Sequence, residues 1–169
     1  MLTLVSYHHP LRVDFEAEFC TAQTDTTATL DSCTCCVIKP HAVKAGATGD
    51  IINTIISQGY EVSAVQSFLL DRATAGEFYE VYKGVIEDYA THVAEMTTGR
   101  VVAMEIRAEN AVQTFRKTVG PHDIEIAKDL FPNTIRGKHG IDNIRNVVHC
   151  TDLPTDGVSE CEYFFDILN

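Results

Sequence analysis

One histidine of the chain stands in a setting that suits nucleophilic chemistry. His149 follows two β-branched residues in the stretch NVVHCTD, residues 146–152, where a predicted strand ends. A neutral imidazole is a competent nucleophile near neutral pH when another group holds its second ring nitrogen. Thr151 and Glu160 follow closely and offer a hydroxyl and a carboxylate for that purpose. The stretch is open to two interpretations: a nucleophile at the end of a buried strand, or a polar residue where a strand meets water.

Three cations stand near loops at the ends or sides of predicted elements. Lys39 closes the first predicted strand, Arg116 lies on a helix beside its apolar stripe, and Arg136 lies in the turn NTIRG. Taken singly, each is more simply explained as a solvated surface side chain. Together with a nucleophilic histidine they favour phosphate chemistry, which depends mostly on positioning and on positive charge.

The cysteines and the remaining histidines give weaker signals. The run CTCC contains a C-x-x-C spacing, Cys33 and Cys36, but a structural zinc site needs a second pair and a redox motif normally opens a helix. The favoured interpretation is buried free thiols in a reducing compartment. A metal or redox protein built on CTCC is kept as a third hypothesis. No H-x-x-x-H or H-E-x-x-H pattern supports a zinc hydrolase.

Composition limits the class of protein. The 169 residues carry a formal net charge of −11, which argues against a nucleic-acid surface because such binding needs a basic face. No apolar run approaches the ~20 residues that span a bilayer, and MLTLVSYHHP lacks a basic start and an extended apolar run. We expect a cytoplasmic protein that does not bind membranes.

The chain divides into an arm and one domain. Residues 1–32 are Thr-rich and poor in apolar side chains, which predicts a linker or a loosely attached arm, with MLTLVSY as a candidate edge strand. From residue 33 onward, short apolar or alternating runs predict strands at 33–39, 60–70, 101–107 and 147–150. Helical spacing predicts helices at 50–59, 74–84, 86–97 and 108–119.

Two further predictions concern the second strand and the C-terminal third of the chain. The second strand is predicted to place Tyr60, Val62, Ala64, Phe68 and Leu70 on one face. Residues 121–140 are predicted to be mostly a long loop, with a last helix and strand within 155–168. The order of elements favours an α+β fold: a ferredoxin-like antiparallel sheet with a βαββαβ core covered by helices.

Four fragments resemble the nucleoside diphosphate kinase family, in order and at near-family spacing: VIKPHAV, VVAMEI, NTIRG and RNVVHCTD. The resemblance covers residues 33–168. The fragments CTCC…KPHAV, EFYEVYKG and VHCTDLPTDG look most like the last kinase domain of the tandem-domain, cilium-associated branch.

The resemblance implies a ping-pong transfer of the γ-phosphate from a nucleoside triphosphate such as ATP to a nucleoside diphosphate. By position, His149 matches the phosphorylated histidine, and Mg²⁺ arrives on the nucleotide phosphates without a protein metal site. The matching site residues are Lys39, Arg116 and Arg136 on the phosphates, Asn146 on the sugar, Tyr79 beside the histidine, and Thr151 and Glu160 behind it.

Departures from the family pattern motivate an alternative function. His41 and Ala42 replace the aspartate and glycine of K-P-D-G-V, Cys150 replaces a glycine, and Tyr89 is the candidate to stack on the base. The loop that in the family helps hold the oligomer is longer here, although a homo-oligomer remains an expectation. The alternative function is a non-catalytic or weakly active nucleotide-binding module of a ciliary or microtubule assembly, with microtubule or axonemal proteins as partners and a location in the cilium or axoneme.

Overall fold

The computed structural model describes residues 26–168. The candidate edge strand MLTLVSY and the residues His8, His9 and Cys20 lie outside the described residues. Of the arm assigned to residues 1–32, the described part lies against the sheet, because the backbone N–H groups of Thr29 and Leu30 donate to the carboxylate of Glu105.

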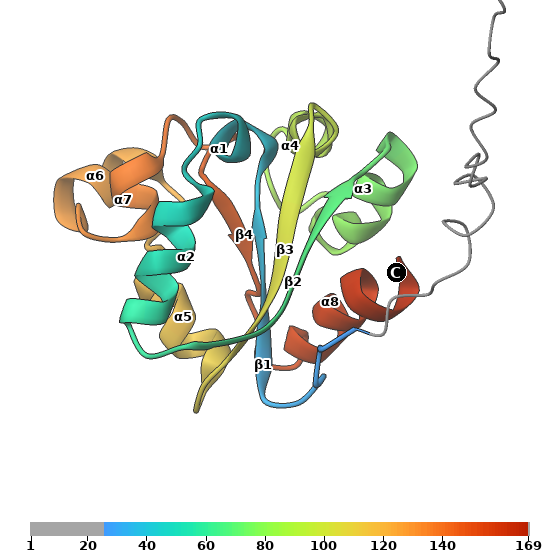
Figure 1. Ribbon diagram of the computed structural model, residues 1–169. Coiled ribbons are helices and arrows are strands. Elements are labelled where there is room, and N and C mark those ends of the chain that lie inside the picture. Colours follow the sequence, from blue (N-terminus) through green and yellow to red (C-terminus); the bar gives the residue numbers. More distant parts are fainter. Residues whose placement is uncertain (1–25, 169) are drawn as a thin grey trace, which may run out of the picture.

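A four-stranded antiparallel sheet forms the centre of the domain (Figure 1). Its strands are β1 (Cys33–Ile38), β2 (Glu61–Leu69), β3 (Arg100–Arg107) and β4 (Val148–Cys150), in the spatial order β2-β3-β1-β4. Every residue of β1 is buried, since this strand has neighbours on both edges and helices on both faces. The site-bearing strand β4 is therefore supported by the most protected strand of the fold.

The helices complete the predicted βαββαβ core, which runs β1-α2-β2-β3-α5-β4. The α-helices are α1 (Pro40–Lys44), α2 (Thr48–Ser57), α3 (Arg72–Phe78), α4 (Tyr89–Met96), α5 (Ala111–Val119), α6 (Ile124–Leu130), α7 (Ile135–His139) and α8 (Gly157–Glu162). A 3₁₀ turn covers Glu80–Tyr82, and a π-helical turn covers Tyr163–Ile167. The ferredoxin-like α+β fold is confirmed.

Two apolar clusters hold the layers together. On one face, α3, α4 and α8 pack on the sheet around Phe78, Met96 and Phe164. On the other face, α2, α5 and α7 pack around Ile51, Phe115 and Ile135. Figure 1 shows these two groups of helices on opposite sides of the strands. No helix among residues 26–168 combines the length and apolar character that crossing a bilayer requires.

The prediction of a long loop over residues 121–140 is wrong. This segment contains α6 and α7, and each helix begins at a side-chain cap that sequence patterning overlooked: Asp123 accepts from the N–H of Ile126, and Thr134 accepts from the N–H of Gly137. Both helices are short, so their apolar spacing is barely periodic and the cap residues are the better signal. No strand follows α8 in the described part of the chain.

The predicted single apolar face of β2 is also wrong. A bulge between Val62 and Ala64 inserts Ser63 into the strand opposite Glu105. Because side chains alternate along a strand, one extra residue moves the following side chains to the other face. Val62 accordingly packs with the second cluster, while Ala64 and Phe68 pack with the first.

Candidate active site

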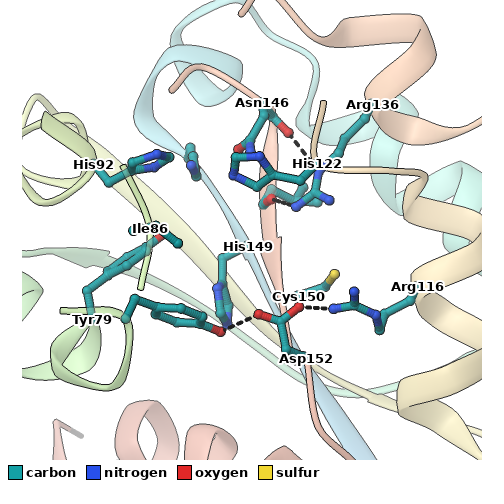
Figure 2. A pocket seen from close by; sticks show the side chains of 13 residues that line it. Tyr79, Ile86, His92, Arg116, His122, Arg136, Asn146, His149, Cys150 and Asp152 are labelled. Atoms are coloured by element: carbon teal, nitrogen blue, oxygen red, sulfur yellow. Dashed lines mark hydrogen bonds and ion pairs between the residues drawn. The ribbon is translucent and has the colours of Figure 1, made fainter. Parts of the chain in front are cut away.

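A pocket of about 470 Å³, counting its open mouth, lies in front of β4. Six of the predicted site residues line it: Lys39, Tyr79, Arg116, Arg136, Asn146 and His149. Figure 2 labels all of these except Lys39 and shows the labelled ones converging from different elements. The fold thus brings together residues that lie more than 100 positions apart in the sequence.

His149 is held rigidly at this pocket. It is the middle residue of β4, pairs with Val37 of β1, and is 6% exposed. The rings of Phe78 and Tyr79 stand edge-on to its imidazole, with centroids 4.9 and 5.8 Å away. These contacts fix the plane of the imidazole and leave little freedom for rotation.

A chain of hydrogen bonds fixes the protonation of the imidazole. The backbone N–H of Cys35 donates to the Thr151 hydroxyl at 2.9 Å, so the hydroxyl proton is free to go to Glu160, 2.9 Å away. The same Glu160 oxygen lies 2.8 Å from Nε2 of His149. The carboxylate therefore accepts the Nε2–H, and Nδ1 keeps its lone pair. Thr151 and Glu160 lie behind the histidine, as the sequence predicted.

The three predicted cations differ in their hydrogen-bond partners and in their exposure. The Lys39 ammonium donates to the carbonyl oxygen of Ile144 at 3.0 Å. The Arg136 guanidinium donates to three backbone carbonyl oxygens, of Gly120, Asn146 and Val148. Arg116, about half exposed, forms an ion pair with Asp152. A phosphate entering the pocket must compete with these acceptors for the same donors.

Burial changes the acidity of the two inner cations. It lowers the pKa of Lys39 to about 7, and the positive charge of Arg136 adds to this effect. Burial also lowers the pKa of Arg136, although an arginine stays charged. In the absence of an anion, Lys39 is thus close to half protonated at neutral pH.

The backbone between the cations and the histidine is strained. Val147, a β-branched residue, has a φ of +77°, in the left-handed region that such residues rarely adopt. His41 stabilises this turn, because its Nε2 accepts the N–H of Val147 at 3.2 Å while its Nδ1 lies 2.8 Å from Glu95. The histidine that replaces the family's aspartate therefore supports the turn before His149.

Two buried polar atoms in the pocket are unpaired among the described residues. They are Oδ1 of Asn146 and Nδ1 of His92. Burying such an atom without a partner costs free energy, and a ligand that fills the pocket would remove that cost. Asn146 was predicted from the resemblance, whereas His92 was not.

The sequence interpretation missed several side chains of the pocket. His92 and His122 lie side by side, and burial lowers the pKa of each to about 4, so both are neutral at pH 7. Tyr82 donates to Asp152 at 2.8 Å and thereby helps to hold the partner of Arg116. Single histidines and tyrosines carry no local signal of this role, because only the fold brings them to β4.

One predicted site residue lies elsewhere. Tyr89 is not part of the pocket lining: it begins α4, packs against the first apolar cluster and donates its hydroxyl to the carbonyl oxygen of Gly76. Its aromatic ring is used in the core, so the suggestion that Tyr89 stacks on a base has no support in this arrangement.

The donor set of the pocket suits Mg²⁺ only when it arrives with a ligand. Asp152 is the single acidic residue that lines the pocket in the described part of the chain, and it already binds Arg116 and Tyr82. Mg²⁺ prefers oxygen ligands and is commonly held by substrate phosphates with one or two carboxylates. The residues therefore fit a metal bound mainly by phosphate oxygens, with Asp152 nearby.

Comparisons with known proteins identify the family of the chain. The family model "Nucleoside diphosphate kinase" matches residues 32–168. A nucleoside diphosphate kinase of Aquifex aeolicus is 33% identical over 130 residues, which are 76% of this chain and 90% of that protein. A crystal structure of the Aquifex aeolicus nucleoside diphosphate kinase superposes with a TM-score of 0.76 at 33% identity, covering 81% of this chain and 96% of the other.

The chain belongs to the nucleoside diphosphate kinase family. Within that family it is more similar to a rat protein, "Nucleoside diphosphate kinase homolog 7", with 50% identity over 143 residues. These residues are 85% of this chain but only 36% of the rat protein, so the chain spans about a third of that relative's length. The predicted resemblance to this family and to its tandem-domain branch is confirmed.

Proposed function

We propose that this domain is a nucleoside diphosphate kinase that works through a phosphohistidine at His149. One observation carries the proposal: Glu160, itself held by a hydrogen bond from Thr151, binds Nε2 of His149, so Nδ1 is the nitrogen with a free lone pair. This nitrogen belongs to a side chain that lines a pocket together with Lys39, Arg116 and Arg136. Membership of the family and the likeness to the Aquifex structure support the same reaction class.

The first half of the reaction forms one bond and breaks one. The lone pair of His149 Nδ1 attacks the γ-phosphorus of a nucleoside triphosphate, and the bond from that phosphorus to the bridging oxygen breaks. The nucleoside diphosphate leaves with the electron pair. The Nε2–H stays on the ring, and its bond to Glu160 stabilises the positive charge of the substituted imidazole.

The second half reverses these steps with another nucleoside diphosphate. Its terminal phosphate oxygen attacks the phosphohistidine, and the electron pair returns to Nδ1. Lys39, Arg116 and Arg136 give up their present acceptors and neutralise the oxygens of the transferred group. Mg²⁺, bound to the nucleotide phosphates, supplies further charge neutralisation.

The unpaired Oδ1 of Asn146 and Nδ1 of His92 suit donors on a nucleotide, such as the hydroxyls of the sugar. With Tyr89 packed in the core, the chain offers no residue predicted from its sequence to read the base. We expect little discrimination between nucleobases.

The test is phosphate transfer from γ-labelled ATP and Mg²⁺ to the purified chain, followed by a chase with a nucleoside diphosphate. Label that is acid-labile, alkali-stable and discharged by the diphosphate is expected. A His149→Asn variant should take up none. Full labelling of that variant would overturn the assignment of the nucleophile.

A second candidate, a module that binds nucleotides but turns them over weakly, has one specific observation in its favour. The inner cations are engaged or partly neutral: Arg136 donates to three carbonyl oxygens, and burial lowers the pKa of Lys39 to about 7. Binding of ATP without labelling of His149 would favour this candidate.

The ciliary location and the microtubule or axonemal partners rest on the resemblance alone, and the cytoplasmic location rests on composition. Association with microtubule or axonemal proteins, a cytoplasmic or ciliary location and a homo-oligomeric state all stay predictions. Co-sedimentation with microtubules and light scattering of the purified chain are the measurements that test the partners and the assembly.

A further inference from the structure

Three cysteines and one glutamate gather on the side of the sheet away from α2 and α5. Cys33 and Cys35 lie on the same face of β1, and Cys35 is paired with Glu105 of the neighbouring strand β3. Cys161 reaches them from α8. All four side chains are 5% exposed or less. We call these four residues the thiol cluster.

Three donor atoms of the thiol cluster lie close to metal-binding separations. The Cys33 and Cys161 sulfur atoms and one carboxylate oxygen of Glu105 all lie within 4.8 Å of one another. In a tetrahedral zinc site, bonds of ~2.3 Å to sulfur and ~2.0–2.2 Å to oxygen place ligand atoms about 3.5–4 Å apart. A contraction of about 1.3 Å or less is enough. The Cys35 thiol, hydrogen-bonded to Cys161 but outside this group of three, must shift toward it to supply a fourth donor.

The carboxylate of the cluster is already oriented, because Thr29, Leu30 and Ser63 donate hydrogen bonds to it. Three of its hydrogen bonds end on Oε1, whereas Oε2 accepts only from the N–H of Leu30 and keeps a lone pair. No lysine, arginine or histidine among residues 26–168 forms an ion pair with Glu105. A buried anion without a cation partner suits a metal ion.

We propose that Cys33, Cys35, Cys161 and Glu105 form a structural site for one Zn²⁺ ion. The set of ligands is the soft sulfur and hard oxygen combination that zinc accepts, and four ligands give its preferred geometry. Because the cluster is closed to solvent, the fourth ligand must come from the chain, and Cys35, which hydrogen-bonds to Cys161, is the remaining thiol of the cluster. The total charge of such a site equals that of a Cys₄ zinc site.

This site differs from the C-x-x-C pair suggested by CTCC. Cys36 faces the second apolar cluster, opposite Cys150 of β4, because side chains alternate along β1. The site therefore combines a C-x-C pair with a cysteine that lies more than 120 residues away in sequence. The spacing along the chain gave no signal of this third sulfur.

Metal binding would bear directly on the position of α8. Gly157 at the start of this helix packs so closely on β1 that an added Cβ would lie 2.2 Å from the carbonyl oxygen of Cys33. Cys161 is the neighbour of Glu160, whose carboxylate holds His149. A metal ion would clamp the helix that orients the histidine to the two central strands β1 and β3 (Figure 1).

Each ligating thiol gives up its proton to solvent when the metal binds. Because binding releases these protons, the apparent affinity for the metal should rise with pH.

The experiment uses the full chain, purified in the presence of a non-thiol reductant, stripped with a chelator and titrated with Co²⁺ as the probe. We expect one Co²⁺ per chain, with the sulfur-to-cobalt charge-transfer band and the visible bands of tetrahedral thiolate coordination. Zn²⁺ should displace the Co²⁺. Cys33→Ser and Cys161→Ser should abolish the charge-transfer band, and Cys35→Ser should weaken binding about 10–100-fold. Cys36→Ser, on the same strand but the opposite face, is the matched control and should bind as the parent does.

A second measurement covers variants that fail to fold. Zn²⁺ should protect the cysteines of the cluster, but not Cys36 and Cys150, from alkylation in partly denaturing conditions, as read by peptide mapping. Stoichiometric metal with this pattern supports the site. Absence of tight Co²⁺ binding, or a charge-transfer band that survives both single variants, would overturn it. If the chain as purified holds no metal and mild oxidation removes two of its free thiols, the cluster forms a disulfide pair and the zinc site is excluded.

Discussion

The carboxylate of Glu160 holds Nε2 of His149 at 2.8 Å, and this single contact decides which ring nitrogen is available for reaction. Replacing Glu160 by glutamine keeps the size of the side chain but removes the charge that stabilises the substituted imidazole. We expect Glu160→Gln to lower the rate of phosphate transfer to His149 by about 10–100-fold. Asp166→Asn, which removes a negative charge from an exposed residue farther along the chain, should leave the rate unchanged. Equal rates for Glu160→Gln and the parent would show that Glu160 has no role in orienting His149.

The low pKa of Lys39 predicts that nucleotide binding takes up a proton. In the nucleotide-free chain, burial and Arg136 lower this pKa to about 7, whereas a bound phosphate raises it again. The affinity for ADP should therefore fall as the pH rises above 7. Calorimetric titrations at pH 8 in buffers of different ionisation enthalpy should reveal uptake of up to about one proton, by the linkage between binding and protonation.

Two lysine variants test whether Lys39 is the residue that takes up the proton. Lys39→Gln should bind ADP more weakly and with no pH dependence from this group. Lys44→Gln, at an exposed position in helix α1, which begins directly after Lys39, should retain both the affinity and the proton uptake. Undiminished proton uptake in Lys39→Gln would assign it to another residue.

The link from His41 to Val147 predicts a loss of stability in acid. The ring must stay neutral to accept the Val147 N–H, and burial lowers the pKa of His41, with Lys39 and Arg145 acting in the same direction against Glu95. Because the folded-state pKa lies below the unfolded value, the unfolded chain takes up this proton first. The contribution of His41 is thus fully present above the unfolded pKa of about 6.5 and is lost as the pH falls through the lower folded pKa.

Replacing His41 by alanine should expose that contribution. An unpaired N–H at Val147 costs about 1–3 kcal/mol in the free energy of unfolding at pH 7.5. Urea denaturation between pH 5 and pH 7.5, at roughly half-unit intervals around the reference pKa, should also show a shallower pH dependence for the variant. His139→Ala on α7 is the control, expected to keep the parental slope. The interpretation would be wrong if His41→Ala and the parent lost stability in parallel.

The close approach of α8 to β1 gives a prediction about packing. Gly157→Ala adds a methyl group 2.2 Å from the carbonyl oxygen of Cys33, so the helix must move. We expect a loss of about 1–3 kcal/mol in the free energy of unfolding, with slower phosphate transfer because Glu160 moves with the helix. Gly76→Ala inside α3 meets no atom within 4 Å and should be neutral or stabilise by about 0.5–1 kcal/mol. Thermal and urea unfolding of both variants provide the comparison.

Most of the fold followed from local patterns, whereas the full set of site residues was assigned from the resemblance to the family. Apolar alternation and helical spacing located the four strands and the helices of the core, because each of these segments keeps either the two-residue period of a strand or the 3.6-residue period of a helix along its length. The errors came where a local rule was interrupted. Ser63 inserts a bulge that exchanges the faces of β2, and the caps Asp123 and Thr134 start helices too short to show a period.

The parts of the site that sequence reasoning missed depend on contacts between distant residues. His41 and Glu95 lie 54 positions apart and meet only because α1 and α4 pack at the same end of the sheet. His92 and His122 meet at the pocket for a similar reason. Tyr89 shows the reverse case: its position in the sequence suggested an aromatic ring at the pocket, but the ring packs against the first apolar cluster. Sequence order can nominate such residues, but packing decides where they lie.

The anchoring of Thr29 and Leu30 on Glu105 has a mechanical consequence. Tension applied through the residues that precede the domain would enter at the middle strand pair, β3 and its neighbour β1, by way of a buried carboxylate with several hydrogen bonds. The strand β1 is also bonded to β4, and its Cys35 N–H holds Thr151, which donates to the Glu160 carboxylate beside His149. A pull on the leading end of the domain would therefore be transmitted to the hydrogen bonds that orient its histidine.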